Sequence, residues 1–233
     1  MKSVVDIIHN NSFFYRLSLV LFVVITLFLA VFSRVDGFIL LNSFHTPTLN
    51  RVFNSITFIG DGLFSIIVSF FILIFAKKHS KLALIVLVAY LSSGIVAQLL
   101  KAMIYAPRPS LYFKLHEYKY YIDTFATSRA GANSFPSGHA ASVYALVTVF
   151  SVYCKNRYVS FCLILIGILA GYSRIYLAHH FLLDVLAGMI LGLLFGTLSL
   201  MWLDKVDSLK INAFLSKYNP LNRNTHFNSI SNK

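Results

Sequence analysis

Two basic residues next to a pair of prolines form the first candidate anion-binding segment. Lys101 and Arg108 are seven residues apart, about two turns of an α-helix, so both side chains can face the same direction near its end. Pro107 and Pro109 indicate where that helix ends, because proline lacks a backbone donor and clashes with the preceding turn. Taken by itself, the segment is also typical of a lysine that extends toward a membrane surface.

A second segment, residues 135–139, has the features of an anion site at the start of a helix. Ser137 is a good N-cap residue, and Gly138 lets the backbone approach a ligand closely. The free N–H groups of a first helical turn attract anions, and His139 lies in that turn. An ordinary capping turn is the alternative interpretation.

A third segment, residues 173–184, combines Arg174, His179, His180 and Asp184. Asp184 follows His180 by four residues, so on a helix its carboxylate can accept one ring N–H and leave the other nitrogen free as a nucleophile. His179 is five residues from Asp184 and should point elsewhere. Arginine, histidine and aspartate are costly in or beside membrane helices, and this makes them functional candidates there.

The elements that must position these residues are apolar helices. The chain has 233 residues, of which 58% are hydrophobic and 12% charged, and its mean hydropathy is +0.73. Soluble domains are about 25% charged, so this composition predicts an all-α, polytopic membrane bundle. A span needs roughly 20 apolar residues, and six runs approach that length, at residues 17–32, 58–76, 82–105, 140–153, 159–177 and 181–203.

The distribution of Lys and Arg predicts the orientation of the bundle. With both termini in the cytoplasm, the inside segments hold 12 of the 20 basic residues, as the positive-inside rule expects. The net charge of +12 forms no continuous basic face, so we expect anionic lipid and phosphate as partners and no nucleic acid. Residues 30–32 are no signal-peptidase site, so the first run should stay as a helix.

Three other polar residues have simpler interpretations. Asp61 follows Gly60 and should cap the second span rather than take part in catalysis. Cys154 and Cys162 have neither zinc-ligand nor disulfide-scaffold spacing, so we expect both to be packing residues.

The aromatic stretch at residues 111–125 suits the headgroup boundary, as a lid or as a passive interfacial helix.

The three segments together resemble the motifs of the type 2 phosphatidic acid phosphatase superfamily, which has the vanadium haloperoxidase-like fold. Its motifs are Lys-x6-Arg-Pro, Pro-Ser-Gly-His and Ser-Arg-x5-His-x3-Asp, and all three occur here in order between Lys101 and Asp184. The compact six-span plan is similar to that of bacterial members. The resemblance implies a membrane phosphatase domain at residues 1–207. With the termini in the cytoplasm, alternating helix direction places its active site outside the cytoplasm, and the polar composition after Asp207 predicts a cytoplasmic tail at residues 208–233.

The resemblance also implies a mechanism without metal or other cofactor. His180 would attack phosphorus to form a phosphohistidine, Asp184 would orient it, and His139 would protonate the departing oxygen and then activate water. Five residues would hold the phosphoryl oxygens: Lys101, Arg108, Ser137, Gly138 and Arg174. The sequence holds no carboxylate cluster of the kind that builds a magnesium site.

The motifs leave the lipid open, because they contact only phosphate. For a bacterial source, undecaprenyl diphosphate is the first expectation, at the inner membrane with the site facing the periplasm or exterior. Phosphatidylglycerophosphate, phosphatidic acid and lipid A are alternatives, as is a phosphotransferase that passes the group to another lipid. A non-enzymatic lipid-binding or transport protein is disfavoured because every motif position is intact. The oligomeric state is not determined by these motifs.

Overall fold

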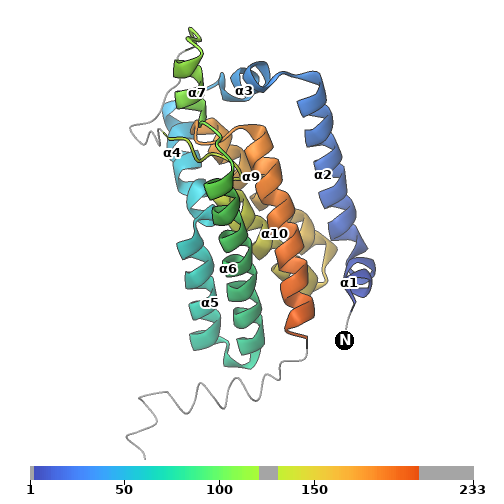
Figure 1. Ribbon diagram of the computed structural model, residues 1–233. Coiled ribbons are helices and arrows are strands. Elements are labelled where there is room, and N and C mark those ends of the chain that lie inside the picture. The colour runs from blue at the N-terminus through green and yellow to red at the C-terminus, as the bar shows by residue number, and fades with distance from the viewer. Residues whose placement is uncertain (1–2, 121–130, 205–233) are drawn as a thin grey trace, which may run out of the picture.

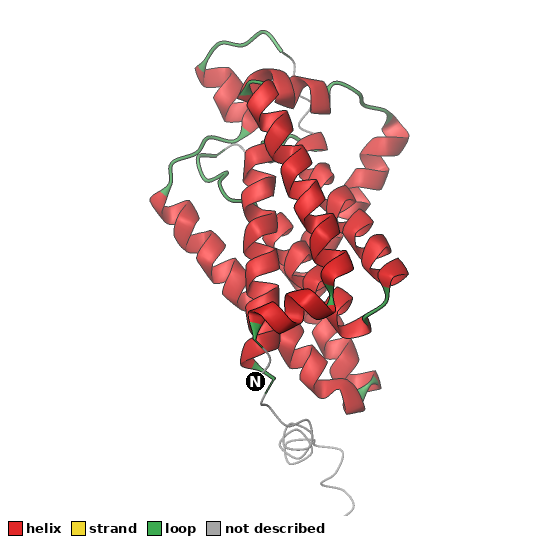
Figure 2. Ribbon diagram, turned by 90° about the vertical axis from the view of Figure 1, so that its right-hand side faces the viewer, coloured by secondary structure: helices red, strands yellow, loops and turns green. Residues whose placement is uncertain are grey.

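The chain is helical over almost all of the residues that the computed structural model describes, 3–120 and 131–204 (Figure 2). Each of the six apolar runs coincides with a helix. These helices are α2 (Ser12–Val31), α5 (Gly62–Phe75), α6 (Ser80–Met103), α8 (Gly138–Cys154), α9 (Arg157–Tyr176) and α10 (Leu182–Trp202). The tail expected at residues 208–233 lies outside the described ranges.

Four of the helices, α2, α6, α9 and α10, are long and apolar enough to cross a membrane. Helix α5 reaches that length only together with the preceding segment, 47–60, from which it is bent by 60°. Helix α8 has 17 residues and is short for a span. The all-α membrane architecture is therefore confirmed, whereas the count of six spans and the side on which the termini lie stay predictions.

Short elements connect the long helices. They are α1 (Val4–Asn10), α3 (Arg34–Asn42), α4 (Pro47–Ile56), the 3₁₀ turns η1 (Thr57–Gly60) and η2 (Lys77–His79), and α7 (Pro109–Leu115). Asp61 Oδ1 accepts a hydrogen bond from the Leu63 N–H at 3.0 Å. This confirms that Asp61 caps the second apolar helix, as its position after Gly60 predicted.

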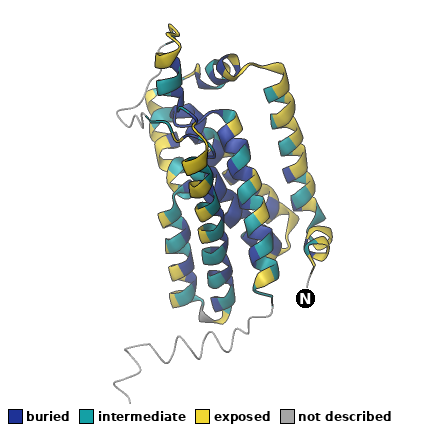
Figure 3. Ribbon diagram, viewed as in Figure 1, coloured by how far each residue is buried: buried dark blue, intermediate teal, exposed yellow. Residues whose placement is uncertain are grey.

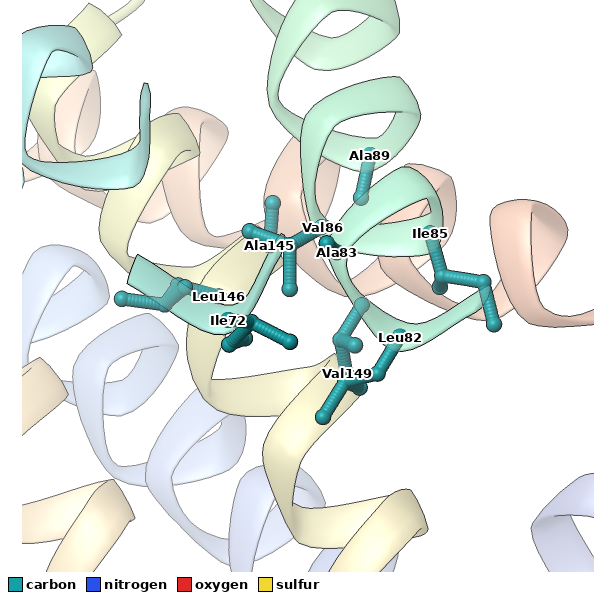
Figure 4. Packing of buried hydrophobic residues seen from close by; sticks show 9 residues of the cluster. All are labelled: Ile72, Leu82, Ala83, Ile85, Val86, Ala89, Ala145, Leu146 and Val149. Atoms are coloured by element: carbon teal, nitrogen blue, oxygen red, sulfur yellow. The ribbon is translucent and has the colours of Figure 1, made fainter. Parts of the chain in front are cut away.

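Helix α8 packs against α6, α9 and α10 and lies behind α6 and α10 in the view of Figures 1 and 3. Twelve of its 17 residues are buried. One apolar cluster joins α8 to α5 and α6, and its nine buried residues include Ile72, Val86 and Val149 (Figure 4). Large apolar side chains such as Leu27 and Ile74 are exposed on the outer faces instead, as expected for a surface in contact with lipid.

Three glycines at four-residue intervals let α10 lie directly against α8. A Cβ atom on Gly188 would be 2.4 Å from the Ser137 carbonyl oxygen, and one on Gly192 would be 2.6 Å from the Ala141 carbonyl oxygen. A Cβ atom on Gly196 would be 2.8 Å from Thr148 Cβ. Small residues at this spacing are typical of close helix contacts in membranes. The contact brings the start of α8, which carries the second motif, against the start of α10, which carries part of the third.

The C-terminal end of α9 is fixed by polar side chains from α3 and α4. The buried Asn42 amide donates to the carbonyl oxygens of Ile175 and Tyr176, both at 2.9 Å. The Tyr176 hydroxyl donates to Asn50 Oδ1 at 2.5 Å. The two Asn42 bonds reach backbone carbonyl groups in the last turn of α9, and together with the Tyr176 bond they hold the chain just before His179 and His180.

Candidate active site

The three motif segments meet at one end of the bundle, where α6 and α9 end and α8 and α10 begin (Figure 1). Ser137 is the N-cap residue of α8, and its hydroxyl accepts from the Ala140 N–H at 3.4 Å. The Ser137 N–H donates to the Asp184 carbonyl oxygen at 2.9 Å. This bond joins the second motif to the third directly.

The first motif is joined to the second by backbone pairing. The Ala106 N–H donates to the Ala132 carbonyl oxygen and the Arg108 N–H to the Gly131 carbonyl oxygen, both at 3.0 Å. The Ser134 N–H returns a bond to the Ala106 carbonyl oxygen at 2.8 Å. The loop after α6 and the loop before α8 are thus held together, although a segment of more than 20 residues separates them in the sequence.

His180 and Asp184 form a buried pair at the start of α10. His180 Nδ1 lies 3.6 Å from Asp184 Oδ2, and both side chains are about 3% exposed. That separation is too long for a hydrogen bond, so the direct bond that the four-residue spacing predicted is not formed, because His180 lies in the turn before α10 rather than on the helix. Asp184 Oδ2 accepts from the Phe181 N–H at 2.9 Å, which holds the carboxylate in the first turn of α10.

Ser134 bridges the two members of this pair. Its hydroxyl donates to Asp184 Oδ2 at 2.6 Å, and its oxygen lies 3.3 Å from His180 Nδ1. A hydroxyl has one proton, so while that proton is directed at Asp184 the oxygen can only accept from Nδ1–H. This arrangement places the ring proton on Nδ1 and leaves the lone pair on Nε2.

Sequence reasoning did not select Ser134, which is fully buried. It lies three residues before Ser137 in a segment with no regular period, and nothing in its local sequence marks it. Its partner Asp184 is 50 residues away in the chain.

Two arginines lie buried beside His180. Arg108 Nη1 donates to the His179 carbonyl oxygen at 3.1 Å, so the backbone of His179, whose ring was given no role, positions an arginine of the first motif. Arg174 Nη1 donates to the hydroxyl of Thr57 in η1, a second contact that the sequence did not indicate. Both guanidinium groups are close enough to His180 to disfavour its protonated form.

The environment of His180 favours the neutral imidazole. His180 lies in the turn between α9 and α10 and is 2% exposed. Burial lowers its pKa to about 4, and the charges of Arg174 and Arg108 act in the same direction, whereas Asp184 opposes them. At neutral pH the ring is therefore unprotonated and retains the lone pair that a nucleophile needs.

Lys101 and His139 line a neighbouring cavity of about 560 Å³. Gly138 lies between them, and a Cβ atom at that position would be 3.7 Å from the Lys101 ammonium nitrogen. His139 packs on Gly60, where a Cβ atom would be 3.0 Å from the His139 Cβ. The cavity continues along α6 past Leu91, Ile95 and Leu99.

The structure thus brings the eight predicted site residues to one end of the bundle in two groups. One group is the buried network of His180, Asp184 and Ser137 with the adjacent Arg108 and Arg174. The other is the cavity wall formed by Lys101, Gly138 and His139. Within the described ranges, no group of three or more His, Cys, Asp or Glu residues could hold a metal ion.

The aromatic stretch beside the site is only partly described. Residues 111–115 fall in α7, where Phe113 is buried against Phe38, with ring centroids 5.5 Å apart. Residues 121–125 lie outside the described ranges. The lid and the passive interfacial helix both stay predictions.

Comparison with known proteins gives several similar sequences. Lipid A 4'-phosphatase of Porphyromonas gingivalis is 28% identical over 161 residues, which are 68% of each chain. Undecaprenyl-diphosphatase BcrC of Bacillus subtilis is 32% identical over 107 residues, 46% of this chain and 50% of that one. Phosphatidylglycerophosphatase B of the same organism is 31% identical over 159 residues, 64% of this chain and 72% of that one.

The fold and the family profile agree with these relatives. The crystal structure of Aquifex aeolicus LpxE superposes with a TM-score of 0.61 at 28% identity and covers 72% of this chain and 94% of its own. The profile of the PAP2 superfamily matches residues 82–207, which is more than half of the chain and includes all three motifs. The chain therefore belongs to the PAP2 superfamily, the family that its motifs predicted.

Proposed function

We propose that the protein hydrolyses the terminal phosphate of a membrane lipid phosphate or diphosphate. The observation that carries the proposal is the cavity in which Lys101 and His139 adjoin an apolar wall. Leu91, Ile95 and Leu99 on that wall are also exposed on the outer face of α6. A lipid could therefore present its phosphate to the polar end while its hydrocarbon chain stays on the membrane side.

The buried network supports His180 as the nucleophile. Nε2 of the neutral ring would attack phosphorus in line, and the bond from phosphorus to the leaving oxygen would break. His139 would give its proton to that oxygen. It would then take a proton from water, which attacks the phosphohistidine, releases phosphate and restores His180.

The cations would stabilise charge on the phosphoryl oxygens during both steps. Arg108 and Arg174 are held beside His180 by the His179 carbonyl and the Thr57 hydroxyl, so little side-chain motion is needed at the moment of reaction. Lys101 and the first-turn N–H groups at Gly138 face the same end of α8. Ser134 and Asp184 would keep the ring proton on Nδ1.

Undecaprenyl diphosphate is the first candidate substrate, since the relatives include an undecaprenyl-diphosphatase. Lipid A and phosphatidylglycerophosphate follow from the other relatives, and phosphatidic acid remains an alternative. The test is phosphate release from a panel of these lipids in detergent. It compares the native chain with His180→Ala and with His116→Ala, a control at an exposed histidine.

Turnover should disappear in His180→Ala and persist in His116→Ala. It should also survive excess EDTA, because protein cations take the place of metal in this scheme. Size-exclusion chromatography checks that the His180 variant is folded. Full activity in folded His180→Ala contradicts the mechanism. Isotope that passes from a labelled donor into a second lipid without free phosphate would indicate a phosphotransferase.

We also propose a bacterial inner-membrane location with the site facing the exterior or periplasm. Cys154 ends α8 at the other end of the bundle and is exposed. Cys162 on α9 is exposed as well, so the prediction that both cysteines are packing residues is wrong. In a Cys162→Ser variant, a membrane-impermeant maleimide should label Cys154 only after the cells are opened. Labelling in intact cells contradicts this orientation.

A further inference from the structure

A second cavity, with charged side chains at its rim, lies at the end of the bundle opposite the active site. It has a volume of about 390 Å³ and is lined by residues of η2 and of the ends of α1, α6, α8 and α10; Figure 1 shows where these helices end. None of the three motifs reaches it, because they lie where α6 and α9 end and α8 and α10 begin. The proposed reaction therefore leaves this cavity without a role.

The lining of the cavity is positively charged. Lys78, Lys81 and Lys155 contribute three ammonium groups, and Asp204 contributes one carboxylate. The net charge is thus +2 with His79 neutral. The amides of Asn10 and Asn11 line the same space and add hydrogen-bonding groups. This set of residues matches a phosphate-bearing ligand.

The rim of the cavity is built by contacts between different elements. The Lys81 ammonium donates to the Asp204 carbonyl oxygen at 2.7 Å, which ties the start of α6 to the end of α10. The Tyr153 hydroxyl lies 2.5 Å from His79 Nδ1, which ties the end of α8 to η2. Lys81 is therefore held at the rim, and these contacts bring η2, α6, α8 and α10 together around one space.

The inner wall of the cavity is apolar and consists of Leu82, Ile85, Val152 and Leu200. Leu82 and Ile85 belong to the buried cluster that joins α5, α6 and α8 (Figure 4). A free anion would gain nothing from such a wall. A lipid would place its charged headgroup among the lysines and its glycerol and first methylene groups against the leucine and isoleucine side chains.

We propose that this cavity binds the headgroup of an anionic phospholipid. Basic pockets between transmembrane helices bind such headgroups in other membrane proteins. The alternative is that the general excess of positive charge at this end attracts anionic lipid without any role for the cavity. Arg16 and Arg157 lie at the same end and contribute charge outside it, where they bond to Ser12 and Tyr158.

These two arginines supply a matched control. The test uses three forms of the delipidated full-length chain in detergent: native, Lys78→Gln/Lys155→Gln, and Arg16→Gln/Arg157→Gln. Both lysines are exposed, so their replacement should leave the fold intact. Native mass spectrometry then measures the binding of phosphatidylglycerol, of phosphatidylcholine with the same acyl chains, and of inorganic phosphate. Phosphatidylglycerol is a diester without a terminal phosphate, so the proposed hydrolysis cannot consume it.

The expected result is that phosphatidylglycerol binds the native and arginine-variant chains alike and the lysine variant at least about tenfold more weakly, since each lysine near the headgroup contributes about a factor of five. Equal affinity for phosphatidylglycerol in all three chains overturns the proposal. So does binding of phosphatidylcholine as tight as that of phosphatidylglycerol. Inorganic phosphate that binds as tightly as phosphatidylglycerol, and is lost with the lysines, would assign the cavity to a free anion instead.

The measurement is independent of the active site. Phosphate release, assayed in parallel, should be the same in the lysine variant as in the native chain at saturating substrate in detergent. If no lipid phosphate is hydrolysed by any of the three chains, the proposed function fails while the binding result still decides on the cavity.

Discussion

Replacement of Gly188 by alanine should separate the two helices that carry the second and third motifs. The added Cβ would lie 2.4 Å from the Ser137 carbonyl oxygen and 2.8 Å from Ala140 Cβ. Ordinary contact begins at 3.4 Å, so α10 has to move away from α8 by about 1.0 Å, the difference between 3.4 and 2.4 Å. The atom in the way is backbone and cannot rotate aside.

That displacement acts directly on the site. The bond from the Ser137 N–H to the Asp184 carbonyl oxygen lengthens, and His180 and Asp184 shift relative to His139. A misplacement of 1 Å can reduce a rate by about a hundredfold. Stability should change less, because overpacking costs about 1–3 kcal/mol and alanine recovers up to about 1 kcal/mol of helix propensity over glycine.

The control is Thr26→Ala on α2, at an exposed position outside the cavity of Lys101 and His139. It also gains helix propensity, because alanine is a better helix former than threonine, and it introduces no clash. We expect kcat/KM for phosphate release to fall about a hundredfold in Gly188→Ala, with a thermal midpoint still high enough for assay at 25 °C. The reasoning is refuted if Gly188→Ala and Thr26→Ala retain activity within about twofold of each other.

The remaining predictions concern the buried network. Ser134→Ala should lower kcat about ten- to a hundredfold with little change in KM, because one hydrogen bond to a charged group contributes about 1.5–3 kcal/mol. The control is Ser151→Ala, which should leave kcat unchanged, because the buried Ser151 hydroxyl has no partner among the described residues. Equal kcat in the Ser134 and Ser151 variants would remove Ser134 from the mechanism. The pH profile should place the acid limb of kcat/KM below pH 6.5, because burial lowers the pKa of His180 to about 4. Measuring two substrates whose phosphate groups differ in pKa shows whether the acid limb comes from the enzyme or from the substrate, because only a limb caused by the substrate moves between them. An acid limb of kcat/KM that stays at 6.5 or above for both substrates contradicts the lowered pKa of His180. As pH falls, His180 takes up its proton at a higher pH in the unfolded chain than in the folded one. The free energy of unfolding should therefore decrease as pH falls from 6.5 toward 4.

The helices and the motif residues could be predicted from the sequence because their signals are local. An apolar run long enough for a membrane span forms a helix wherever it occurs, since backbone groups in hydrocarbon must bond within their own segment. The six runs accordingly coincide with six helices. The spacing between His180 and Asp184 predicted that the two side chains lie together, and they do, although His180 is in the turn before α10 and only Asp184 is on the helix.

Some local details were harder to read from hydropathy. The second apolar run contains a bend of 60° between η1 and α5, which a hydropathy average cannot show. The fourth run forms only a 17-residue helix, because Ser137 caps it at one end and it ends at Cys154 before Lys155, whose φ is +51°.

The sequence by itself determined the all-α membrane class and the family, and it predicted which residues face phosphate. Only the tertiary structure decided that Ser134 bridges His180 and Asp184, that Thr57 holds Arg174, and that glycines on α10 let the motifs meet. The physical reason is distance along the chain. Hydropathy and helical spacing act over a few residues, whereas the partners of Ser134 and Thr57 lie 50 and 117 residues away and come into contact only when the helices pack.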